Sequence, residues 1–462
     1  MNLAIGKNPL IVGLGKTGLS CIAFFNRINQ SYHALDSRSD CAGQKQAQQD
    51  ALCQSVTMNG LDGNQAQHKK FLEQSGISSL IVSPGVATRG ALFDAATELD
   101  IEIIGDIELF ARAINQDQNS RVIAITGSNG KSTVTKLIYD LMNTAGYSVA
   151  VGGNIGTPVL DLLTDPEQWY VLELSSFQLE TTYSLVVEVA TVLNLSEDHM
   201  NRYDSFQQYA DTKLALLKFA KHQVIDIDEL PELDGKYSDA LRFGLNQQNN
   251  NSILNYDQTR RVIELQSNLS NAVHIFDTQK LLIPGLHNIR NVMTVLAICE
   301  LADFKWTVEF KNYLYQWPGL EHRCSFVAEK HNVKFYNDSK ATNIGATIAA
   351  IDGFAATSDA KIILIAGGDG KGAEFSPLAT KFRKYLRALV LLGKDAEQIF
   401  EQAGKGLQSS IVADMKEAVT TAFKFSRPGD LVLLSPACAS LDMYSNFEQR
   451  GKDFQNCVEA LA

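Results

Sequence analysis

The residues best placed to do chemistry are Lys131, Ser132 and Thr133, which directly follow a glycine-rich turn at residues 127–130. Glycines allow a backbone to fold tightly enough to direct successive N–H groups at a polyphosphate. In such a loop the lysine reaches the β- and γ-phosphates, and the serine hydroxyl holds Mg²⁺. The usual pattern has a glycine where this chain has Ile125. An ordinary strand-turn-helix with a surface lysine is therefore the alternative interpretation.

The segments on either side of this turn have the types that a phosphate-binding loop requires. Residues 122–125 are apolar and mostly β-branched, which predicts a buried strand. Behind the turn, apolar side chains recur at the spacing of one helix face: Val134, Leu137, Ile138, Leu141 and Met142. Because the N-terminus of a helix favours bound anions, we favour phosphate binding over a surface loop.

A second glycine motif lies near the start of the chain, where residues 13–18 read G-x-G-x-x-G after an apolar run at 10–12. The next strand-like run, 32–35, ends in Asp36, at the position of the acid that binds ribose in a dinucleotide fold. A further strand at 80–82 runs into a turn, where open α/β sheets bind ligands. The pattern fits a nucleotide site, and it fits equally a glycine turn that serves only helix-strand packing.

Polar residues also follow strands in the middle of the chain. Glu173 ends the apolar run 170–172 and is a candidate Mg²⁺ ligand, and His199 follows the long apolar run 186–193. In a parallel sheet these strand ends would meet beside the phosphate loop. A lone histidine is more often structural than a ligand, and Mg²⁺ prefers oxygen, so the residues alone argue against His199. Lys213 lies in an expected helix and, on its residue type alone, is a surface lysine.

The last third of the chain again alternates strands with helical stretches. Residues 367–371 read Gly-Gly-Asp-Gly-Lys after an apolar strand, and they fit either a second anion site or an ordinary loop lysine. Residues 435–440 are small and allow close approach of a ligand, but they lack the context of a nucleophile elbow. Arg323 and Asp338 carry no signal on their own. Residues 220–280 show only a weak pattern.

The alternation of strands and helices predicts an α/β fold with three domains. The predicted domains are a Rossmann-like N-terminal domain at 1–110, a central domain with a P-loop ATPase-like parallel sheet at 111–319, and a Rossmann-like C-terminal domain at 320–462. Pro318-Gly319 is the expected hinge between the second and the third.

Composition excludes several classes of protein. With 462 residues and a net charge of −11, the chain lacks the clustered basic residues that nucleic acid or an anionic membrane requires. The seven cysteines form no CxxC pair, which favours reduced cytosolic thiols over a zinc site. We find no run of about eighteen apolar residues and no basic segment before an apolar run. We therefore expect a cytoplasmic protein without membrane insertion.

Seven stretches together give the chain a resemblance to a known family: 126–133, 172–179, 197–200, 285–288, 337–343, 367–371 and 435–442. They resemble the Mur ligases, the ATP-dependent enzymes that add amino acids in peptidoglycan synthesis. The phosphate loop of that family lacks the first glycine of the usual pattern, which accounts for Ile125. The last three stretches most resemble the branch that adds D-glutamate to UDP-N-acetylmuramoyl-L-alanine.

The resemblance implies a set of ligands for each domain. The UDP-linked substrate would be bound by Leu14, Thr17, Asp36, Ser37, Arg38, Ser83, Gly85, Asn154 and His199. ATP would be bound by Gly127, Ser128, Asn129, Gly130, Lys131, Ser132, Thr133, Asn288, Asn291, Arg323 and Asp338. D-Glutamate would be bound by Thr342, Lys371, Ser440, Leu441 and Phe447. Two Mg²⁺ ions would be held by Ser132, Glu173, His199 and a carbamylated Lys213, and the catalytic residues would be Lys131, His199 and Lys213.

The resemblance thus reverses the interpretation of His199 and Lys213 that the residues alone suggest. It implies that the γ-phosphoryl group of ATP passes to a carboxylate to give an acyl phosphate. The amine of D-glutamate then attacks the acyl carbon, which yields an amide, ADP and phosphate. Because an acyl phosphate hydrolyses in water, we expect the C-terminal domain of a monomer to close over the central domain about residues 318–319.

Three other interpretations remain open at this point. One is another Mur ligase or a folylpolyglutamate synthase, which resembles this fold. The second is an NAD-dependent dehydrogenase that uses residues 13–18 with Asp36, although it leaves the loop around Lys131 without a role. The third is a nucleotide-binding regulator without catalysis.

Overall fold

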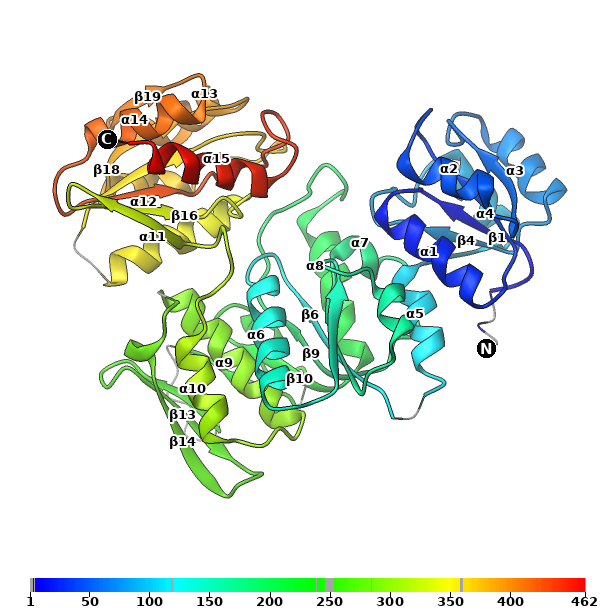
Figure 1. Ribbon diagram of the computed structural model, residues 1–462, viewed down its shortest axis with the longest axis horizontal. Helices are drawn as coiled ribbons and strands as arrows, with labels where there is room; N and C mark the ends of the chain where they lie inside the picture. Colours follow the sequence, from blue (N-terminus) through cyan, green and yellow to red (C-terminus); the bar gives the residue numbers. More distant parts are fainter. Residues whose placement is uncertain are drawn as a thin grey trace.

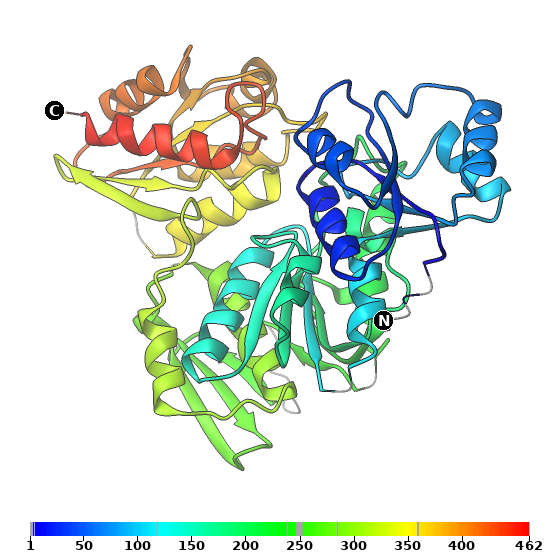
Figure 2. The same cartoon turned by 45° about the vertical axis from the view of Figure 1, so that its right-hand side comes forward.

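The chain forms three lobes, each built on its own largely parallel sheet, in a computed structural model (Figures 1 and 2). The structure describes residues 3, 5–117, 119–237, 239–245, 253–283, 285–357 and 360–461. In both views the N-terminal lobe (blue) and the C-terminal lobe (yellow to red) lie above the central lobe (cyan to green). Among the described residues, no helix is both long enough and apolar enough to cross a membrane.

The N-terminal lobe is a five-stranded parallel sheet of order β3-β2-β1-β4-β5. Its strands are β1 (Pro9–Val12), β2 (Tyr32–Leu35), β3 (Cys53–Thr57), β4 (Ser79–Val82) and β5 (Glu102–Gly105), and its helices are α1 (Lys16–Arg27), α2 (Ala42–Gln49), α3 (Gln65–Gln74) and α4 (Ala91–Glu98). The strands predicted at 10–12, 32–35 and 80–82 are confirmed. Because the strand order reverses between β1 and β4, their carboxyl ends form the crevice where such sheets bind ligands.

The central lobe is a six-stranded parallel sheet of order β11-β10-β9-β6-β8-β7. Its strands are β6 (Arg121–Thr126), β7 (Val149–Gly153), β8 (Trp169–Glu173), β9 (Val187–Val192), β10 (Ala220–Asp226) and β11 (Leu241–Phe243). Its α-helices are α6 (Lys131–Thr144), α7 (Ser176–Leu179), α8 (Phe206–Leu214), α9 (Leu286–Leu301) and α10 (Val308–Gln316), and a short 3-10 helix, η1, spans Val159–Thr164. The strands carry continuous apolar runs because helices cover both faces of the sheet.

A small antiparallel sheet follows in the region where the sequence shows only a weak pattern. It consists of β12 (Leu254–Asp257), β13 (Val262–Ser267) and β14 (Ala272–Asp277) in that order. Its inner face is buried through residues such as Ile263 and Phe276, whereas Val273 and Ile275 on its outer face are exposed. The polar run 246–251 lies outside the described residues.

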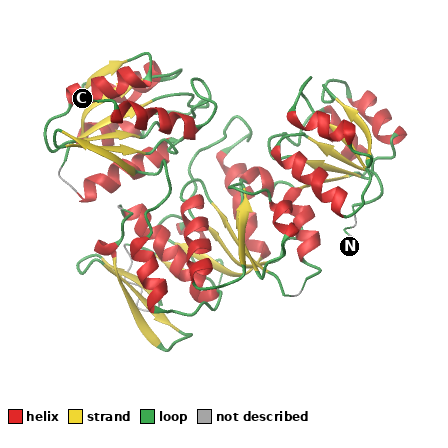
Figure 3. Ribbon diagram, viewed as in Figure 1, coloured by secondary structure: helices red, strands yellow, loops and turns green. Residues whose placement is uncertain are grey.

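The C-terminal lobe is a six-stranded sheet of order β15-β16-β20-β17-β18-β19, with β15 antiparallel to β16 and the other pairs parallel. Figure 3 shows the strands of this lobe (yellow) among its helices (red). Its strands are β15 (Ser325–Lys330), β16 (Val333–Asn337), β17 (Ile362–Ala366), β18 (Leu386–Leu391), β19 (Gln408–Ile411) and β20 (Leu431–Leu434). Its helices are α11 (Ile344–Thr357), α12 (Leu378–Tyr385), α13 (Ala396–Ile399), α14 (Met415–Phe425) and α15 (Phe447–Glu459). The sequence did not predict the edge strands β15 and β19.

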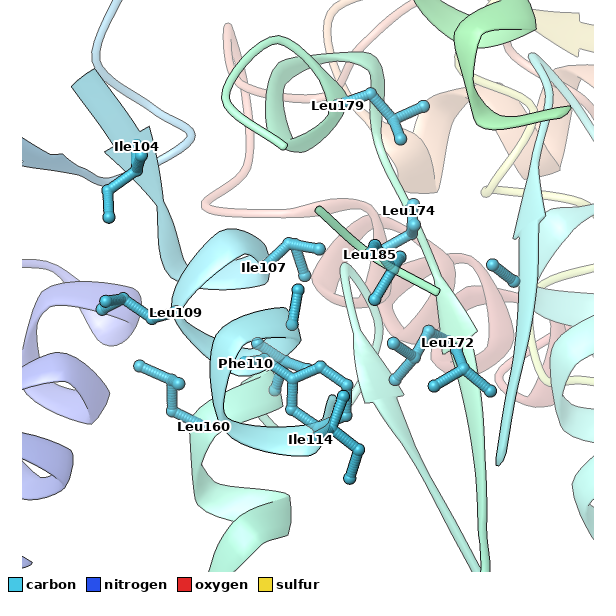
Figure 4. Packing of buried hydrophobic residues seen from close by; sticks show 14 of the residues in the cluster. Ile104, Ile107, Leu109, Phe110, Ile114, Leu160, Leu172, Leu174, Leu179 and Leu185 are labelled. Atoms are coloured by element: carbon cyan, nitrogen blue, oxygen red, sulfur yellow. The ribbon is translucent and has the colours of Figure 1, made fainter. Parts of the chain in front are cut away.

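Helix α5 (Asp106–Ile114) joins the first two lobes through one apolar cluster (Figure 4). Phe110 of α5 packs edge-on against Tyr170 of β8, with 5.2 Å between ring centroids. The boundary predicted at residue 110 falls within this helix, whose side chains contact both lobes. The boundary predicted at residue 319 falls between α10 and β15.

Candidate active site

The phosphate-binding loop connects β6 to α6, in the arrangement that the sequence predicts. Gly127 and Gly130 have φ angles of 145° and 84°, which glycine adopts at little cost. A Cβ on Gly130 would lie 2.7 Å from Oδ1 of Asn291, so a larger residue there would displace this side chain of α9. The Nζ of Lys131 donates to the carbonyl oxygens of Gly127 at 2.7 Å and Ser128 at 2.9 Å. These contacts hold the ammonium beside the loop, where phosphate oxygens could replace the two carbonyls.

Glu173 ends β8, beside the strand that leads into the phosphate loop, and is 2% exposed. Its Oε1 accepts a hydrogen bond from Nδ2 of Asn154 at 2.7 Å. Its Oε2 is buried and has no hydrogen-bond partner among the described residues. A buried carboxylate oxygen without a donor is costly, and Mg²⁺, which prefers oxygen ligands, fits this position. Ser132 in the first turn of α6 carries the hydroxyl that the loop pattern assigns to the same ion.

Lys213 is buried beside the phosphate loop, so its interpretation as a surface lysine is wrong. It is 2% exposed, and its Nζ donates to the carbonyl oxygen of Gly127 at 3.0 Å and to Oγ1 of Thr126 at 3.4 Å. Burial, and next the charge of Lys131, hold the pKa of Lys213 well below its ordinary value. Residue type could not reveal this, because α8 packs against a loop that is distant in the sequence.

His199 lies in the loop after β9 with a φ of 58°, which is uncommon for a residue other than glycine. The backbone N–H of His199 donates to Oδ1 of Asp198 at 2.9 Å. The imidazole ring meets the ring of Phe177 edge-on, with 4.8 Å between centroids. Burial lowers the pKa of His199 to about 4, against the opposing charge of Asp198. The imidazole is therefore neutral near pH 7 and keeps a lone pair for a ligand.

One cavity of about 610 Å³ lies between the central and C-terminal lobes. The central lobe lines it with Ser128, Asn129, Lys131, Ser132, Asn154, Glu173, Asp198 and His199. The C-terminal lobe lines it with Arg323, Lys340, Thr342, Asn343, Asp369, Lys371, Ser440, Leu441 and Phe447. The structure thus brings the five residues expected for D-glutamate into the same space as the phosphate-loop lysine and three of the four expected metal ligands, Ser132, Glu173 and His199. Lys213 does not line this cavity, and its Nζ contacts residues 126 and 127 at the start of the phosphate loop.

A second cavity, of about 220 Å³, adjoins the first and shares Asn129, Arg323 and Lys340 with it. Among its lining residues are Gly130, Thr133, Asn288, Asn291 and Asp338, which are expected to bind ATP. Burial raises the pKa of Asp338 to about 7, although the Ser435 hydroxyl donates to its Oδ2 at 2.8 Å. The two cavities together could hold a nucleotide whose phosphates lie over the loop.

Three side-chain contacts join the two lobes at this site: Arg323 Nη2 to Ser132 Oγ at 3.2 Å, Asn343 Nδ2 to Asn129 Oδ1 at 3.1 Å, and Lys371 Nζ to Asp198 Oδ1 at 3.3 Å. Sequence reasoning did not single out Asn343, Lys340 or Asp198. The signal that could have found them is their place within residues 337–343 and 197–200, two of the stretches that carry the resemblance. Burial, and next the charge of Arg323, lower the pKa of Lys340 to about 8.

The residues expected to bind the uridine diphosphate lie at the carboxyl ends of β1, β2 and β4. Asp36 is 2% exposed and accepts hydrogen bonds from the Leu14 N–H at 2.7 Å and from Nε of Arg38 at 2.8 Å. The Arg38 guanidinium holds the pKa of Asp36 far below its ordinary value. The Ser83 hydroxyl donates to the Gly13 carbonyl at 2.8 Å, which ties β4 to the glycine motif. Thr17 lies in the first turn of α1, and Ser37 and Gly85 follow β2 and β4.

The two interpretations of the glycine motif apply to different glycines. A Cβ on Gly18 would lie 2.1 Å from the Gly13 carbonyl oxygen, so this glycine serves the packing of α1 on β1. A Cβ on Gly15 would meet no atom of the described residues within 4 Å, and Gly15 precedes the first residue of α1. Space over a helix N-terminus is where a phosphate group can approach.

These features define a three-domain α/β protein in which a phosphate-binding loop faces the cationic side chains of another domain. Three family models match the chain: "Mur ligase MurD-like, N-terminal domain" at residues 7–105, "Mur ligase middle domain" at 125–299 and "Mur ligase, glutamate ligase domain" at 322–438. The chain belongs to the Mur ligase family.

Similar proteins cover nearly the whole chain. UDP-N-acetylmuramoylalanine–D-glutamate ligase of Pseudoalteromonas translucida is 41% identical over 460 residues, which are 98% of this chain and 97% of that protein. The protein of the same name from Pseudomonas syringae pv. syringae is 41% identical over 456 residues, 98% of each chain. A pseudomurein peptide ligase type C of Methanothermus fervidus has the same fold, with a TM-score of 0.60 at 14% identity over 98% of this chain and 99% of that one. MurC of Thermotoga maritima gives a TM-score of 0.58 at the same identity and coverage.

Proposed function

We propose that this protein adds D-glutamate to UDP-N-acetylmuramoyl-L-alanine, with ATP as the energy source, in the synthesis of peptidoglycan precursors. The observation that carries the proposal is the single cavity in which Lys131, Glu173 and Lys371 meet. A ligase of this kind needs a phosphate loop, a cation site and an amino-acid site in one space. The names of the relatives that align over their full length support the same substrates.

The chemistry follows from the poor reactivity of a carboxylate, whose leaving oxygen is anionic. Transfer of the γ-phosphoryl group of ATP to the alanyl carboxylate forms a P–O bond and breaks the bond to ADP. Lys131 offsets negative charge on the transferred group. The amine of D-glutamate then forms the C–N bond and loses a proton, and phosphate leaves with the former carboxylate oxygen. Lys371 binds a carboxylate of D-glutamate and so places its amine at the acyl carbon.

As a Mur ligase, the protein uses ATP and Mg²⁺. Ser132, Glu173 and His199 would hold the metal, because the buried Oε2 of Glu173 has no donor in the part of the chain that the structure describes and the His199 imidazole is neutral. Mg²⁺ supplies Lewis-acid neutralisation of phosphate charge. We propose that the site holds two Mg²⁺ ions.

We include in the proposal a carbamate on Lys213. Carbon dioxide reacts with a neutral amine, forming an N–C bond with loss of one proton, and the lowered pKa of Lys213 favours the neutral form of its amine. The product is a carboxylate, which converts a buried amine into an oxygen ligand. We expect activity to fall in buffer depleted of carbon dioxide and to return when bicarbonate is added.

We further propose a monomeric, cytoplasmic enzyme whose C-terminal lobe moves about residues 318–319. Closure would exclude water from the acyl phosphate. Small-angle scattering with and without an ATP analogue and the UDP-linked substrate tests this motion, and identical profiles would count against it.

The decisive experiment measures phosphate release with purified protein, ATP and Mg²⁺. Release should require both UDP-N-acetylmuramoyl-L-alanine and D-glutamate. L-alanine, L-lysine and diaminopimelate should not replace D-glutamate. Phosphate release that does not depend on both substrates would contradict the proposal. Nicotinamide binding detected by fluorescence would instead support the alternative of an NAD-dependent dehydrogenase.

A further inference from the structure

Arg202 lies three residues after His199 and connects three parts of the molecule. Its Nη2 donates to Oε2 of Glu180, the residue that follows α7, at 2.8 Å. Its Nη1 donates to the carbonyl oxygen of Pro84 in the N-terminal lobe at 3.2 Å. Its backbone N–H donates to the carbonyl oxygen of His199 at 2.8 Å and so closes the turn that carries the histidine. Only 11% of the side chain is exposed.

The ring of Phe177 links this guanidinium to the imidazole. The Cζ of Arg202 lies 4.3 Å from the centroid of the Phe177 ring, and the same ring contacts His199. Tyr203 stacks on Phe177 with 6.2 Å between centroids, and its hydroxyl donates to Oε1 of Glu180 at 2.6 Å. Both oxygens of Glu180 are thus engaged. A displacement of Arg202 therefore changes the surface against which the imidazole rests.

The other end of Arg202 reaches a loop expected to contact the UDP-linked substrate. Pro84 lies between Ser83 and Gly85, which are both in the expected substrate set. We propose that Arg202 is a positioning residue that couples residues 83–85 to the orientation of His199. This inference rests on the proposed function, because that function makes residues 83–85 a substrate site.

The guanidinium is suited to this role because it is planar and carries donors at several positions. It can donate to Glu180 and Pro84 while its face packs on the Phe177 ring. A lysine could keep the charge and one of these contacts, but it offers no planar fork. Arg202→Lys is therefore expected to restore only part of what Arg202→Met removes.

The first test measures binding of UDP-N-acetylmuramoyl-L-alanine by calorimetry without ATP or Mg²⁺. Arg202→Met should bind about tenfold more weakly than the wild type, and Arg202→Lys should lie between them. Arg89→Met is the matched control, because Arg89 is also an arginine at this junction but is exposed and donates to the Asn201 carbonyl at 3.4 Å. The control should bind like the wild type.

The second test separates positioning from a general loss of structure. In Arg202→Met, kcat should fall and KM for the UDP-linked substrate should rise by about tenfold, while KM for ATP and D-glutamate stays within about twofold. Glu180→Gln should act in the same direction. The Arg202→Met, Glu180→Gln double variant should be less impaired than the sum of the single effects, because the two side chains act as a unit.

Two results would overturn the inference. One is wild-type affinity and KM for the UDP-linked substrate in Arg202→Met, and the other is an equal rise of all three KM values. If Arg202→Met fails to fold, the same measurements on Arg202→Lys decide. A wild-type protein that neither binds nor uses the UDP-linked substrate would refute the proposed function itself. An active wild type whose affinity and KM for that substrate do not change in Arg202→Met would refute only this inference.

Discussion

The Nζ of Lys371 lies 3.3 Å from Oδ1 of Asp198, so an ion pair joins the C-terminal lobe to the central lobe at the edge of the large cavity. Both side chains are largely buried, with 26% and 14% exposed. The cation expected to bind D-glutamate therefore already faces a carboxylate of the protein. An incoming carboxylate must compete with Asp198 for the same ammonium.

Replacement of Lys371 by methionine tests this relationship. We expect KM for D-glutamate to rise by about tenfold or more, because a charge-assisted contact is lost. KM for ATP should change little. Lys394→Met is the control, since Lys394 is 61% exposed and pairs with Asp369 near the same loop. An unchanged KM for D-glutamate in Lys371→Met would contradict the assignment of this lysine.

Lys131→Met should abolish phosphate release while leaving thermal stability nearly unchanged. The side chain donates to two carbonyls of its own loop and contributes little to an apolar core. We expect a loss of at least about a hundredfold in kcat, because charge on the transferred phosphoryl group loses its neutralising partner. Lys136→Met, five residues further along α6, removes an ion pair with Asp140 and a contact with the Tyr139 ring, both outside the phosphate loop, and should remain active. Wild-type turnover in Lys131→Met would refute the assignment.

Gly18→Ala and Gly15→Ala should separate packing from ligand approach in the glycine motif. The alanine Cβ at position 18 would lie 2.1 Å from the Gly13 carbonyl oxygen, so we expect destabilisation of about 1–3 kcal/mol. At position 15 the Cβ meets nothing, so the melting temperature should hold while affinity for the UDP-linked substrate falls. Thermal unfolding and calorimetry measure the two effects. Equal stability of both variants would show that Gly18 is not a packing residue.

The pH dependence of stability should change in Asp106→Asn. Burial raises the pKa of Asp106, at the start of α5, to about 6 from an ordinary value of 3.8. The folded protein then holds this proton more tightly than the unfolded chain. The stabilisation of the folded state by protonated Asp106 is complete below pH 3.8 and is lost as the pH rises through about 6.

Asparagine cannot ionise, so the melting temperature of Asp106→Asn should improve relative to the wild type between pH 5 and pH 7.5. The difference corresponds to about 1–3 kcal/mol. Scanning fluorimetry at several pH values measures it. Asp94→Asn, at an exposed position of α4, should show no such trend. A constant difference between Asp106→Asn and the wild type would mean that Asp106 does not titrate in this range.

Local sequence patterns were sufficient for the elements that build the site. The apolar run before residue 126 and the helical spacing after residue 131 predicted β6 and α6, because periodicity and glycine act over a few residues. The G-x-G-x-x-G motif predicted β1 and α1 in the same way. The strands β12, β13 and β14 escaped prediction because each has only four to six residues and pairs with a neighbour across a turn.

The chain by itself determined its local elements, its phosphate loop and a resemblance to one family. Only the tertiary structure decided that Lys213 is buried beside that loop and that Lys371 meets Asp198. It also decided that Glu173 keeps a buried oxygen to which no described residue donates. Burial and charge pairing depend on which distant segments pack together. No pattern within one segment records that choice, because it is made by the free energy of the whole fold.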